Sequence, residues 1–389
     1  MRRLPLAALT MVALALPACG ASAPTGVPPP RPTDTPLAAP LAAALAAARE
    51  RAALPAVAGL VVRVGGVEAR LVLGLRRADQ PASTASPDDR FHLGSNSKAI
   101  TAALLARLVE HGVLRWETTL AEAFPELAPA MTPAYRGVTL RQLVDHRGGL
   151  PPFTTPPELL GAPALARSAA GATPAEARDD RRAFTAWLLA RPTAAAPGTF
   201  VYSNAGYAVA AAVAERATGA DWETLLRERL LRPLGLPDAS VALGWPALAG
   251  AHPWGHVDAG ARWQPHDPRD GRLLAIPAAL APAGDLSMTL DAYARVLQLL
   301  LRGLAGQDDL LRAAAVRALT TPDGAYGGGW VAATAHGAPA FAHEGSAGTF
   351  HAVTILVPSR GVGAVVIVNA GGERAAAAAR EAALRALAP

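Results

Sequence analysis

The stretch Phe91-His92-Leu93-Gly94-Ser95-Asn96-Ser97-Lys98 places a serine and a lysine three residues apart, where a short apolar segment meets a helical pattern. Downstream of it, apolar residues recur at four-residue spacing and a glycine closes the run (Ile100, Leu104, Leu108, Gly112). This spacing predicts a helix that begins near the serine. Because residues three apart share one face of a helix, we expect the side chains of Ser95 and Lys98 to lie together.

The two residue types suggest a chemical reason for this spacing. A serine hydroxyl becomes a strong nucleophile when a neighbouring base removes its proton, and a partly desolvated lysine amine can be that base near pH 7. Arginine cannot. The chain has 36 basic residues, and Lys98 is the single lysine among them. The motif therefore favours a serine nucleophile with a lysine base, and its alternative is a helix-capping serine beside a solvated lysine.

The first residues are typical of a secretory signal. Arg2 and Arg3 precede an apolar run from Leu4 to Leu16, which is too short to span a bilayer. A small residue and then Cys19 follow, which resembles the site at which bacterial lipoproteins are lipidated. We predict a signal peptide over residues 1–18, a lipid anchor at Cys19 and a location in the periplasm or cell envelope. The alternative is an ordinary signal peptide that is cut nearby.

Composition sets the domain organisation and excludes some partners. Residues 19–36 are rich in Pro, Ala, Ser and Thr and predict an extended tether. One catalytic domain is expected over 37–389, with an α/β lobe at 37–100 and 285–389 and a helical lobe at 101–284. Cleavage would leave 34 basic against 31 acidic residues, a balance that argues against nucleic-acid binding. A single cysteine excludes disulfides and thiolate metal sites within the chain, and we expect no metal or cofactor.

Strand patterns lie at both ends of the mature chain. Residues 57–64 and 67–73 surround Gly65-Gly66, a hairpin signal, and short β-rich runs return at 330–334, 340–343, 350–357 and 362–369. Helical patterns cover 41–53 and 373–387, and the middle of the chain is mostly helical. The predicted fold class is α+β, with an antiparallel sheet built from both chain ends, helices flanking it and an inserted helical lobe.

Three further stretches accompany the serine. Tyr202-x-Asn204 precedes an alanine-rich helix, His343-Glu344-Gly345-Ser346 ends a strand, and Leu143 to Pro151 follows a helical segment. The order S-x-x-K, Y-x-N and H-x-G resembles the serine β-lactamase and penicillin-binding superfamily. Within it, the chain is similar to the class C-like branch of class C β-lactamases, D-amino-acid peptidases and family VIII carboxylesterases. The resemblance runs from about residue 37 to 369 and implies the serine β-lactamase/DD-peptidase fold.

The resemblance implies a role for each matching residue. Ser95 would be the acylated nucleophile, and Lys98 would accept its proton. Tyr202 would pass the proton to the leaving group, for which its phenolate needs stabilisation by the adjacent Lys98 cation. Asn204 would position Lys98 and the substrate.

The third motif departs from the pattern of β-lactamases and transpeptidases. Their K-[ST]-G lysine binds the substrate carboxylate, whereas His343 takes that place here, and an unperturbed histidine is mostly neutral at pH 7. We therefore expect esters or other amides ahead of β-lactam or D-Ala-D-Ala substrates. Gly345 and Ser346 would complete the substrate-binding strand, with the backbone amides of Ser95 and Ser346 holding the oxyanion. Strand alternation points Glu344 away from His343, and we expect it to be solvated.

Other candidate motifs carry less weight. His252 and His256 are four residues apart, but Pro253 and Gly255 between them argue against a helical metal pair. The nucleophile motif G-x-S-x-G is absent, which excludes an α/β-hydrolase. Packing is the favoured role for three tryptophans that could otherwise wall an acyl pocket (Trp245, Trp254, Trp263).

These observations predict an exported, membrane-tethered serine hydrolase of the class C-like branch. It would act through an acyl-enzyme on small ester or amide substrates, as an esterase or a peptidase-like enzyme, without a cofactor. One alternative is a β-lactamase or D-Ala-D-Ala carboxypeptidase. A second, from another class, is a non-catalytic cell-envelope lipoprotein that binds a ligand. The expected partners are a small-molecule substrate and, through the anchor, a membrane.

Overall fold

The computed structural model describes residues 36–162, 165, 172–238, 241–243, 251–260, 262–267, 276–321 and 324–388. They all belong to the compact unit Pro32–Pro389, and the unit Met1–Arg31 lies outside them. The predicted signal peptide, Cys19, Trp245 and the tether up to residue 35 therefore fall outside the described residues.

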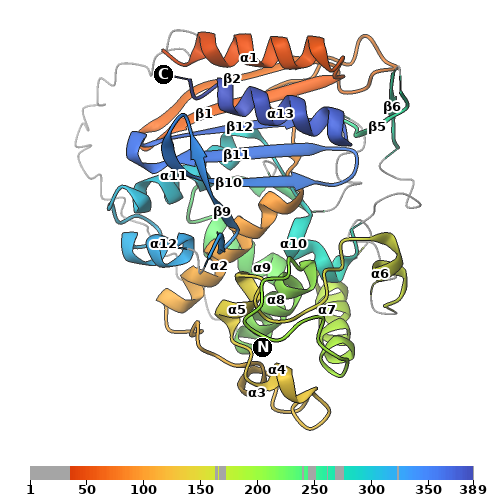
Figure 1. Cartoon of the computed structure of the whole chain (residues 1–389), viewed down its shortest axis with the longest axis vertical. Coiled ribbons are helices and arrows are strands. Elements are labelled where there is room, and N and C mark those ends of the chain that lie inside the picture. The colour runs from red at the N-terminus through yellow and green to blue at the C-terminus, as the bar shows by residue number, and fades with distance from the viewer. Residues whose placement is uncertain are drawn as a thin grey trace, which may run out of the picture. The chain divides into compact units, whose positions relative to one another are not determined.

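The central element is a seven-stranded sheet drawn from both ends of the chain (Figure 1). Its strands are β1 (Ala56–Arg63), β2 (Gly66–Gly74), β8 (Tyr326–Gly327), β9 (Trp330–Ala335), β10 (Ala338–Ser346), β11 (His351–Val357) and β12 (Val362–Val368). They lie in the order β2-β1-β12-β11-β10-β9-β8, and each neighbouring pair is antiparallel. N-terminal β1 pairs with C-terminal β12, from Val57 opposite Val368 to Arg63 opposite Val362. The predicted antiparallel sheet from both chain ends is confirmed.

Alternation along the strands divides the buried side chains between two cores. Val57 and Val61 join the core under α1 (Ala38–Arg51) and α13 (Glu373–Arg385), which lie on one face of the sheet in Figure 1. Leu60 on the same strand faces the second core, with α2 (Ser97–Glu110), α8 (Asn204–Thr218) and α11 (Leu290–Leu304). Burial of these apolar side chains is the main favourable contribution to folding. It also fixes α2 beneath the sheet.

Helices and turns of different lengths fill the region between the two strand groups. They are α3 (Leu120–Ala123), α4 (Pro133–Arg136), α5 (Leu140–Val144), α6 (Pro156–Leu160), α7 (Pro174–Leu189), α9 (Trp222–Leu226), η4 (Arg227–Leu231), η7 (Ala278–Leu280) and α10 (Ala281–Gly284). Later in the chain follow α12 (Ala313–Thr320) and η8 (Pro358–Arg360). Buried Arg181 on α7 bonds Glu215 on α8, Glu223 on α9 and the carbonyl of Ala278. This ion-pair cluster ties three helices together.

Two smaller sheets complete the described residues. β3 (Phe91–His92) pairs with β7 (Leu286–Met288), which also pairs with β4 (Val241–Leu243). β5 (His256–Asp258) pairs with β6 (Trp263–Pro265). The pairing of β3 with β7 was not predicted from the sequence, because strands this short leave no periodic pattern. It fixes the chain immediately before η1 (Gly94–Asn96), the turn that contains Ser95.

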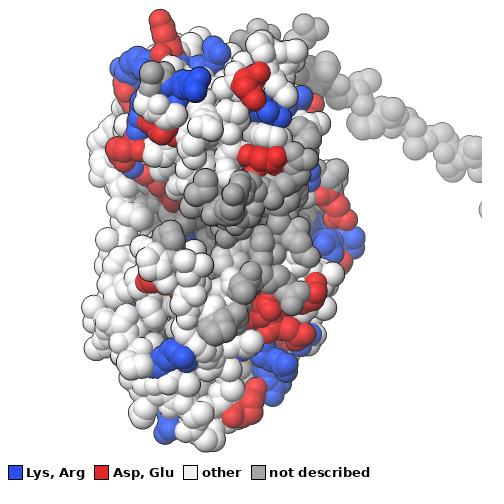
Figure 2. Space-filling model, turned by 90° about the vertical axis from the view of Figure 1, so that its right-hand side faces the viewer, with Lys and Arg blue, Asp and Glu red and all other residues white. Residues whose placement is uncertain are grey.

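Charged residues of both signs are interspersed on the face shown in Figure 2, and the coloured residues there form no patch of a single sign. The near balance of basic and acidic residues in the sequence agrees with this distribution. Within the described ranges, no helix combines the length and apolarity needed to cross a bilayer.

Candidate active site

Ser95 and Lys98 meet where η1 continues into α2, as the sequence predicted. Ser95 is partly exposed, while the side chain of Lys98 is fully buried at 0% exposure. The Lys98 amine nitrogen lies 3.1 Å from Ser95 Oγ, within hydrogen-bonding distance. The alternative of a solvated lysine is therefore wrong for this chain.

Two further oxygens surround the amine of Lys98. Asn204 Oδ1 and the backbone carbonyl of Ala283 both accept from Nζ at 2.7 Å. Burial lowers the pKa of Lys98 well below its usual value, because desolvation penalises the charged ammonium. The amine is thus held next to the serine hydroxyl and is biased toward the neutral form that can take a proton.

Tyr202 and Asn204 come from the start of α8. Ser203 caps this helix by accepting from the amide of Gly206 at 3.1 Å, and Asn204 Nδ2 donates to the carbonyl of Phe153 at 2.9 Å. The helix start therefore turns Asn204 toward Lys98. Both residues of the Y-x-N motif lie beside the serine–lysine pair.

Tyr202 rests as a neutral phenol. Burial raises its pKa to about 12, although its hydrogen bond with Ser95 acts in the opposite direction. The Lys98 amine lies 4.8 Å from the centroid of the Tyr202 ring. The phenolate that the sequence argument invoked is therefore not the resting form, and the hydroxyl holds a proton that it can donate.

The end of β10 passes very close to the turn that contains Ser95. A Cβ added to Gly345 would lie 2.0 Å from the Leu93 carbonyl oxygen and 2.8 Å from the Ser95 amide nitrogen. A Cβ on Gly94, which has φ +52°, would lie 2.5 Å from the amide nitrogen of Ser346. Because both positions are glycine, the end of β10 can approach the turn that contains Ser95, and Ser95 and Ser346 line one cavity.

His343 lies on β10 and is buried. Burial lowers its pKa to about 3, and the nearby Lys98 acts in the same direction. Its ring packs against Tyr326, with the two centroids 5.8 Å apart. His343 is therefore neutral throughout the physiological pH range and supplies no positive charge for a carboxylate.

Glu344 is not simply solvated, so the expectation for this residue was wrong. Its carboxylate accepts from Arg380 Nε on α13 at 2.8 and 2.9 Å, and its Oε2 lies 3.0 Å from His351 Nε2 on β11. Hydrogen bonds from these two partners lower its pKa to about 2, against the effect of burial. The sequence predicted the alternation of the strand but not the distant arginine, so Glu344 belongs to the packing of α13 on the sheet.

His146 lies behind Tyr202. Its Nδ1 accepts from the amide of Ser203 at 3.1 Å, and its ring lies 4.3 Å from that of Tyr202 and 4.6 Å from that of Tyr326, measured between centroids. Burial lowers the pKa of His146 well below its usual value. These contacts give His146 a structural role, in which it supports the ring of Tyr202.

A cavity of about 320 Å³ opens beside Ser95. All of its described lining residues are uncharged (Ser95, Phe153, Thr154, Leu159, Asn204, Ile276, Pro277, Leu280, Ala283, Gly284, Ser346, Ala347, Gly348). Its wall combines aliphatic and aromatic side chains with the polar groups of the serine, the asparagine and the end of β10. Such a cavity suits a neutral, mostly apolar group next to Ser95.

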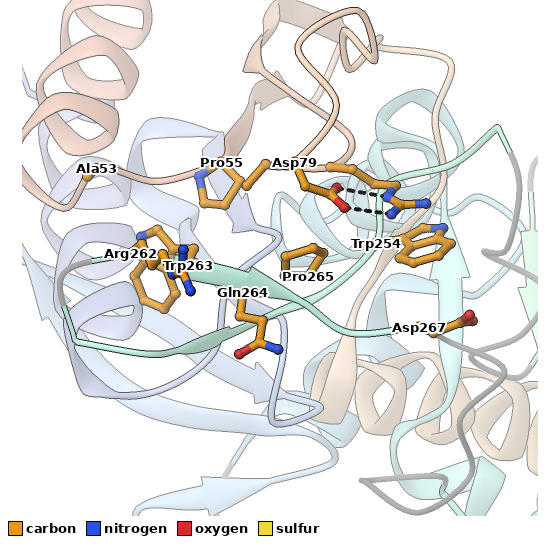
Figure 3. A pocket seen from close by; sticks show the side chains of 11 residues that line it. Ala53, Pro55, Asp79, Trp254, Arg262, Trp263, Gln264, Pro265 and Asp267 are labelled. Atoms are coloured by element: carbon orange, nitrogen blue, oxygen red, sulfur yellow. Dashed lines mark hydrogen bonds and ion pairs between the residues drawn. The ribbon is translucent and has the colours of Figure 1, made fainter.

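Trp254 and Trp263 belong to a different pocket, so they do not wall the site at Ser95. They line a cavity of about 690 Å³ at the β5–β6 hairpin, together with Arg77 and Asp79 (Figure 3). Arg77 stacks 3.7 Å from the centroid of the Trp254 ring. The favoured packing role of these two tryptophans agrees with this arrangement.

His256 uses both ring nitrogens on the backbone. Nδ1 lies 2.7 Å from the carbonyl oxygen of Asn369, and Nε2 accepts from the amide of Ala78 at 3.0 Å. In the part of the chain that the structure describes, no three His, Cys, Asp or Glu residues are arranged to hold a metal ion. The two backbone contacts of the ring give His256 a structural role.

Sequence reasoning missed three groups at the site. The carbonyl of Ala283 is a backbone atom, and no residue type marks it as a partner for Lys98. His92 and Asp285 form a buried pair across 193 residues. His92 lies shortly before Ser95, and Asp285 directly follows α10. The sequence shows a histidine two residues before Gly94, but nothing in it indicates that this histidine is buried or that Asp285 is its partner.

A serine held against a buried lysine, beneath an antiparallel sheet, is the arrangement expected of the β-lactamase-fold family of serine hydrolases. The family model described as Beta-lactamase matches residues 41–388, and the chain belongs to this family. The predicted family and fold class are both confirmed.

The names of individual relatives indicate different functions. Penicillin-binding protein 4 of Amycolatopsis lactamdurans is 29% identical over 330 residues, which are 81% of each chain. Esterase EstB of Burkholderia gladioli is 31% identical over 201 residues, 51% of this chain and 50% of that protein. The solved D-alanine carboxypeptidase AmpC of Burkholderia cenocepacia superposes with a TM-score of 0.68 at 20% identity, covering 90% of this chain and 98% of that one. At that identity the likeness shows the fold alone.

Proposed function

We propose that this protein is an exported serine hydrolase of the class C-like branch, which forms an acyl-enzyme on Ser95 and hydrolyses small neutral esters or amides. The observation that carries the proposal is the buried Lys98 amine, 3.1 Å from Ser95 Oγ and with a lowered pKa. A neutral amine in that place can accept the hydroxyl proton as the oxygen attacks a carbonyl carbon.

The proton balance follows from the groups around the serine. Ser95 Oγ forms the new bond to the acyl carbon while its proton moves to Lys98. Tyr202, a phenol at rest, gives its proton to the departing oxygen or nitrogen and regains one from the Lys98 ammonium. In deacylation, the oxygen of a water molecule bonds to the acyl carbon while one water proton moves to Lys98. The bond from the acyl carbon to Ser95 Oγ then breaks, and Lys98 returns the proton to Ser95. The amides of Ser95 and Ser346 hold the oxyanion, and each such donor contributes about 3 to 4 kcal/mol in comparable enzymes.

The substrate class follows from the charge at the site. The described lining of the cavity is uncharged, Lys98 is buried behind Ser95, and His343 is neutral. A substrate that carries a carboxylate would lose water there without gaining a cation. The likeness to Esterase EstB supports neutral esters, while the likeness to Penicillin-binding protein 4 favours a β-lactamase or D-Ala-D-Ala carboxypeptidase as the second candidate.

Steady-state hydrolysis of a short-chain chromogenic ester and a chromogenic β-lactam, measured side by side, tests the substrate class. We expect ester turnover with little β-lactam turnover, because only the β-lactam brings a carboxylate. Brisk β-lactam turnover would contradict the charge argument and favour the second candidate. Background rates with both substrates would favour the non-catalytic lipoprotein.

Export and lipid anchoring at Cys19 complete the proposal. They are supported by the charged start, the short apolar run and the single cysteine of the sequence. We expect the protein to partition into the membrane fraction and to incorporate a labelled fatty acid, and we expect Cys19→Ser to lose the label. Equal labelling of wild type and Cys19→Ser would contradict the anchor.

A further inference from the structure

A buried histidine–carboxylate pair lies immediately beside the nucleophile turn, and the proposed steps do not use it. His92 and Asp285 are each 1% exposed, and His92 Nε2 lies 3.0 Å from Asp285 Oδ1. The other ring nitrogen, Nδ1, accepts from the backbone amide of Gly94 at 3.0 Å. The pair is therefore hydrogen-bonded to Gly94, the residue that precedes Ser95.

The hydrogen bonds from Asp285 through His92 to Gly94 fix which atom donates and which accepts at each step. A backbone N–H can only donate, so Nδ1 of His92 is the unprotonated acceptor and its proton is on Nε2. Nε2–H then donates to the Asp285 carboxylate. A carboxylate, an imidazole and a backbone amide thus form one ordered series, in which the carboxylate holds the imidazole in the tautomer that binds Gly94.

The other side of Gly94 is fixed as well. Its carbonyl accepts from Ser97 Oγ at 2.7 Å, and Ser97 Oγ in turn accepts from the amide of Leu286 at 3.1 Å. This carbonyl and the Ser95 N–H belong to the same peptide unit, so holding the carbonyl orients the N–H. Gly94 adopts φ +52°, a conformation that a glycine leaves readily unless its neighbours hold it.

Asp285 also connects this turn to the partners of Lys98. It follows α10, whose Ala283 carbonyl accepts from Lys98 Nζ at 2.7 Å. Thr101 Oγ1, one turn further along α2, donates to the carbonyl of Pro282 at 2.8 Å. The segment that holds the base and the turn that holds the nucleophile are therefore joined through the His92–Asp285 contact.

We propose that His92, oriented by Asp285, is a positioning residue that fixes the Gly94–Ser95 peptide unit, so that the Ser95 amide faces the oxyanion and Ser95 Oγ faces the carbonyl carbon. This inference rests on the proposed function, since it assigns a task within the same acylation. The imidazole touches neither substrate nor the reacting atoms, and it acts through the backbone.

Two polar variants separate the two bonds of His92. In His92→Asn, the shorter amide has an oxygen that can accept from the amide two residues on, as asparagine does in turns, which preserves the bond to Gly94. In His92→Gln, the longer amide reaches toward Asp285 but leaves the Gly94 amide without its acceptor. Both variants keep a polar group in the buried site, so both preserve the fold better than an apolar replacement does.

The readouts are kcat and KM for the chromogenic ester, and the affinity for a boronic acid that forms a tetrahedral adduct on the serine. For His92→Gln we expect kcat to fall about 100-fold with KM little changed, since misplacement by about 1 Å costs that much. Boronic acid affinity should fall in parallel, while the affinity for a planar competitive amide stays the same. His92→Asn should stay close to wild type in kcat, in KM and in its affinity for the boronic acid.

His256→Gln is the matched control. His256 is also fully buried and also bridges backbone groups, but its partners are Asn369 and Ala78 and not the nucleophile turn. We expect it to lower the melting temperature while kcat of the folded enzyme and the tetrahedral-to-planar affinity ratio stay at wild-type values.

Equal kcat and equal boronic acid affinity in His92→Gln and His92→Asn would overturn the positioning role and leave the proposed function intact. So would parallel losses in His92→Gln and His256→Gln, because a general loss of stability would then explain both. A wild-type protein that neither turns over the ester nor binds the boronic acid would overturn the proposed function and this inference together.

Discussion

Replacing Ser95 by alanine is expected to lower kcat for a short-chain ester about 10⁴-fold or more, because no acyl-enzyme can then form. Ser95 Oγ is the hydroxyl that lies 3.1 Å from the Lys98 amine. Another serine of the cavity, Ser346, has its hydroxyl engaged with the amide of Gly348 at 3.1 Å. Ser346 is therefore not placed to replace Ser95 as the nucleophile.

The measurement is kcat at saturating ester, with circular dichroism and a melting curve to show that Ser95→Ala is folded. Ser346→Ala is the matched control, since it removes a hydroxyl from the same cavity and keeps the backbone amide. We expect it to retain most of the activity. Wild-type kcat in Ser95→Ala would contradict the assignment of the nucleophile.

Lys98→Arg is expected to lower kcat/KM about 1000-fold, a loss in the range that general acid–base catalysis contributes. Arginine keeps the positive charge and hydrogen-bond donors but does not lose its proton in a protein. Lys98→Met, which fits a fully buried site without a charge, should be equally inactive. The pair of variants thus separates a need for charge from a need for a removable proton.

The pH profile gives the same test in the wild type. Because the neutral amine is the active form, kcat/KM should rise as pH rises through the pKa of Lys98. Burial lowers that pKa well below the usual 10.5, so the rise should occur well before that pH. An active Lys98→Arg with an unchanged pH profile would show that Lys98 is not the base.

Much of the site could be predicted from the sequence because its chemistry is local. Ser95 and Lys98 share a helix face through their spacing. Asn204 lies 106 residues after Lys98, and the resemblance of the Y-x-N motif, not spacing, assigned it and Tyr202 to the same site. The strands at both chain ends were predicted from β-rich runs and turn residues, and the structure joins them in one sheet. Short-range spacing was enough wherever the partners lie within one or two turns.

Contacts between distant segments could not be predicted. The pairing of His92 with Asp285 and of Glu344 with Arg380 depends on how the sheets and helices pack, and periodicity carries no information about it. The third partner of Lys98 is a backbone carbonyl, which every residue has. Burial, rather than a neighbouring charge, determines the pKa of Tyr202, and burial by distant segments also depends on packing.

The most direct test of the central claim is to treat the folded wild-type protein with a fluorophosphonate probe, measure its intact mass and map the labelled peptide. We expect one adduct per chain, located on Ser95, and no adduct in Ser95→Ala. A folded wild-type protein that takes up no probe, or an adduct on another residue, would contradict the claim that Ser95 is the nucleophile of a serine hydrolase.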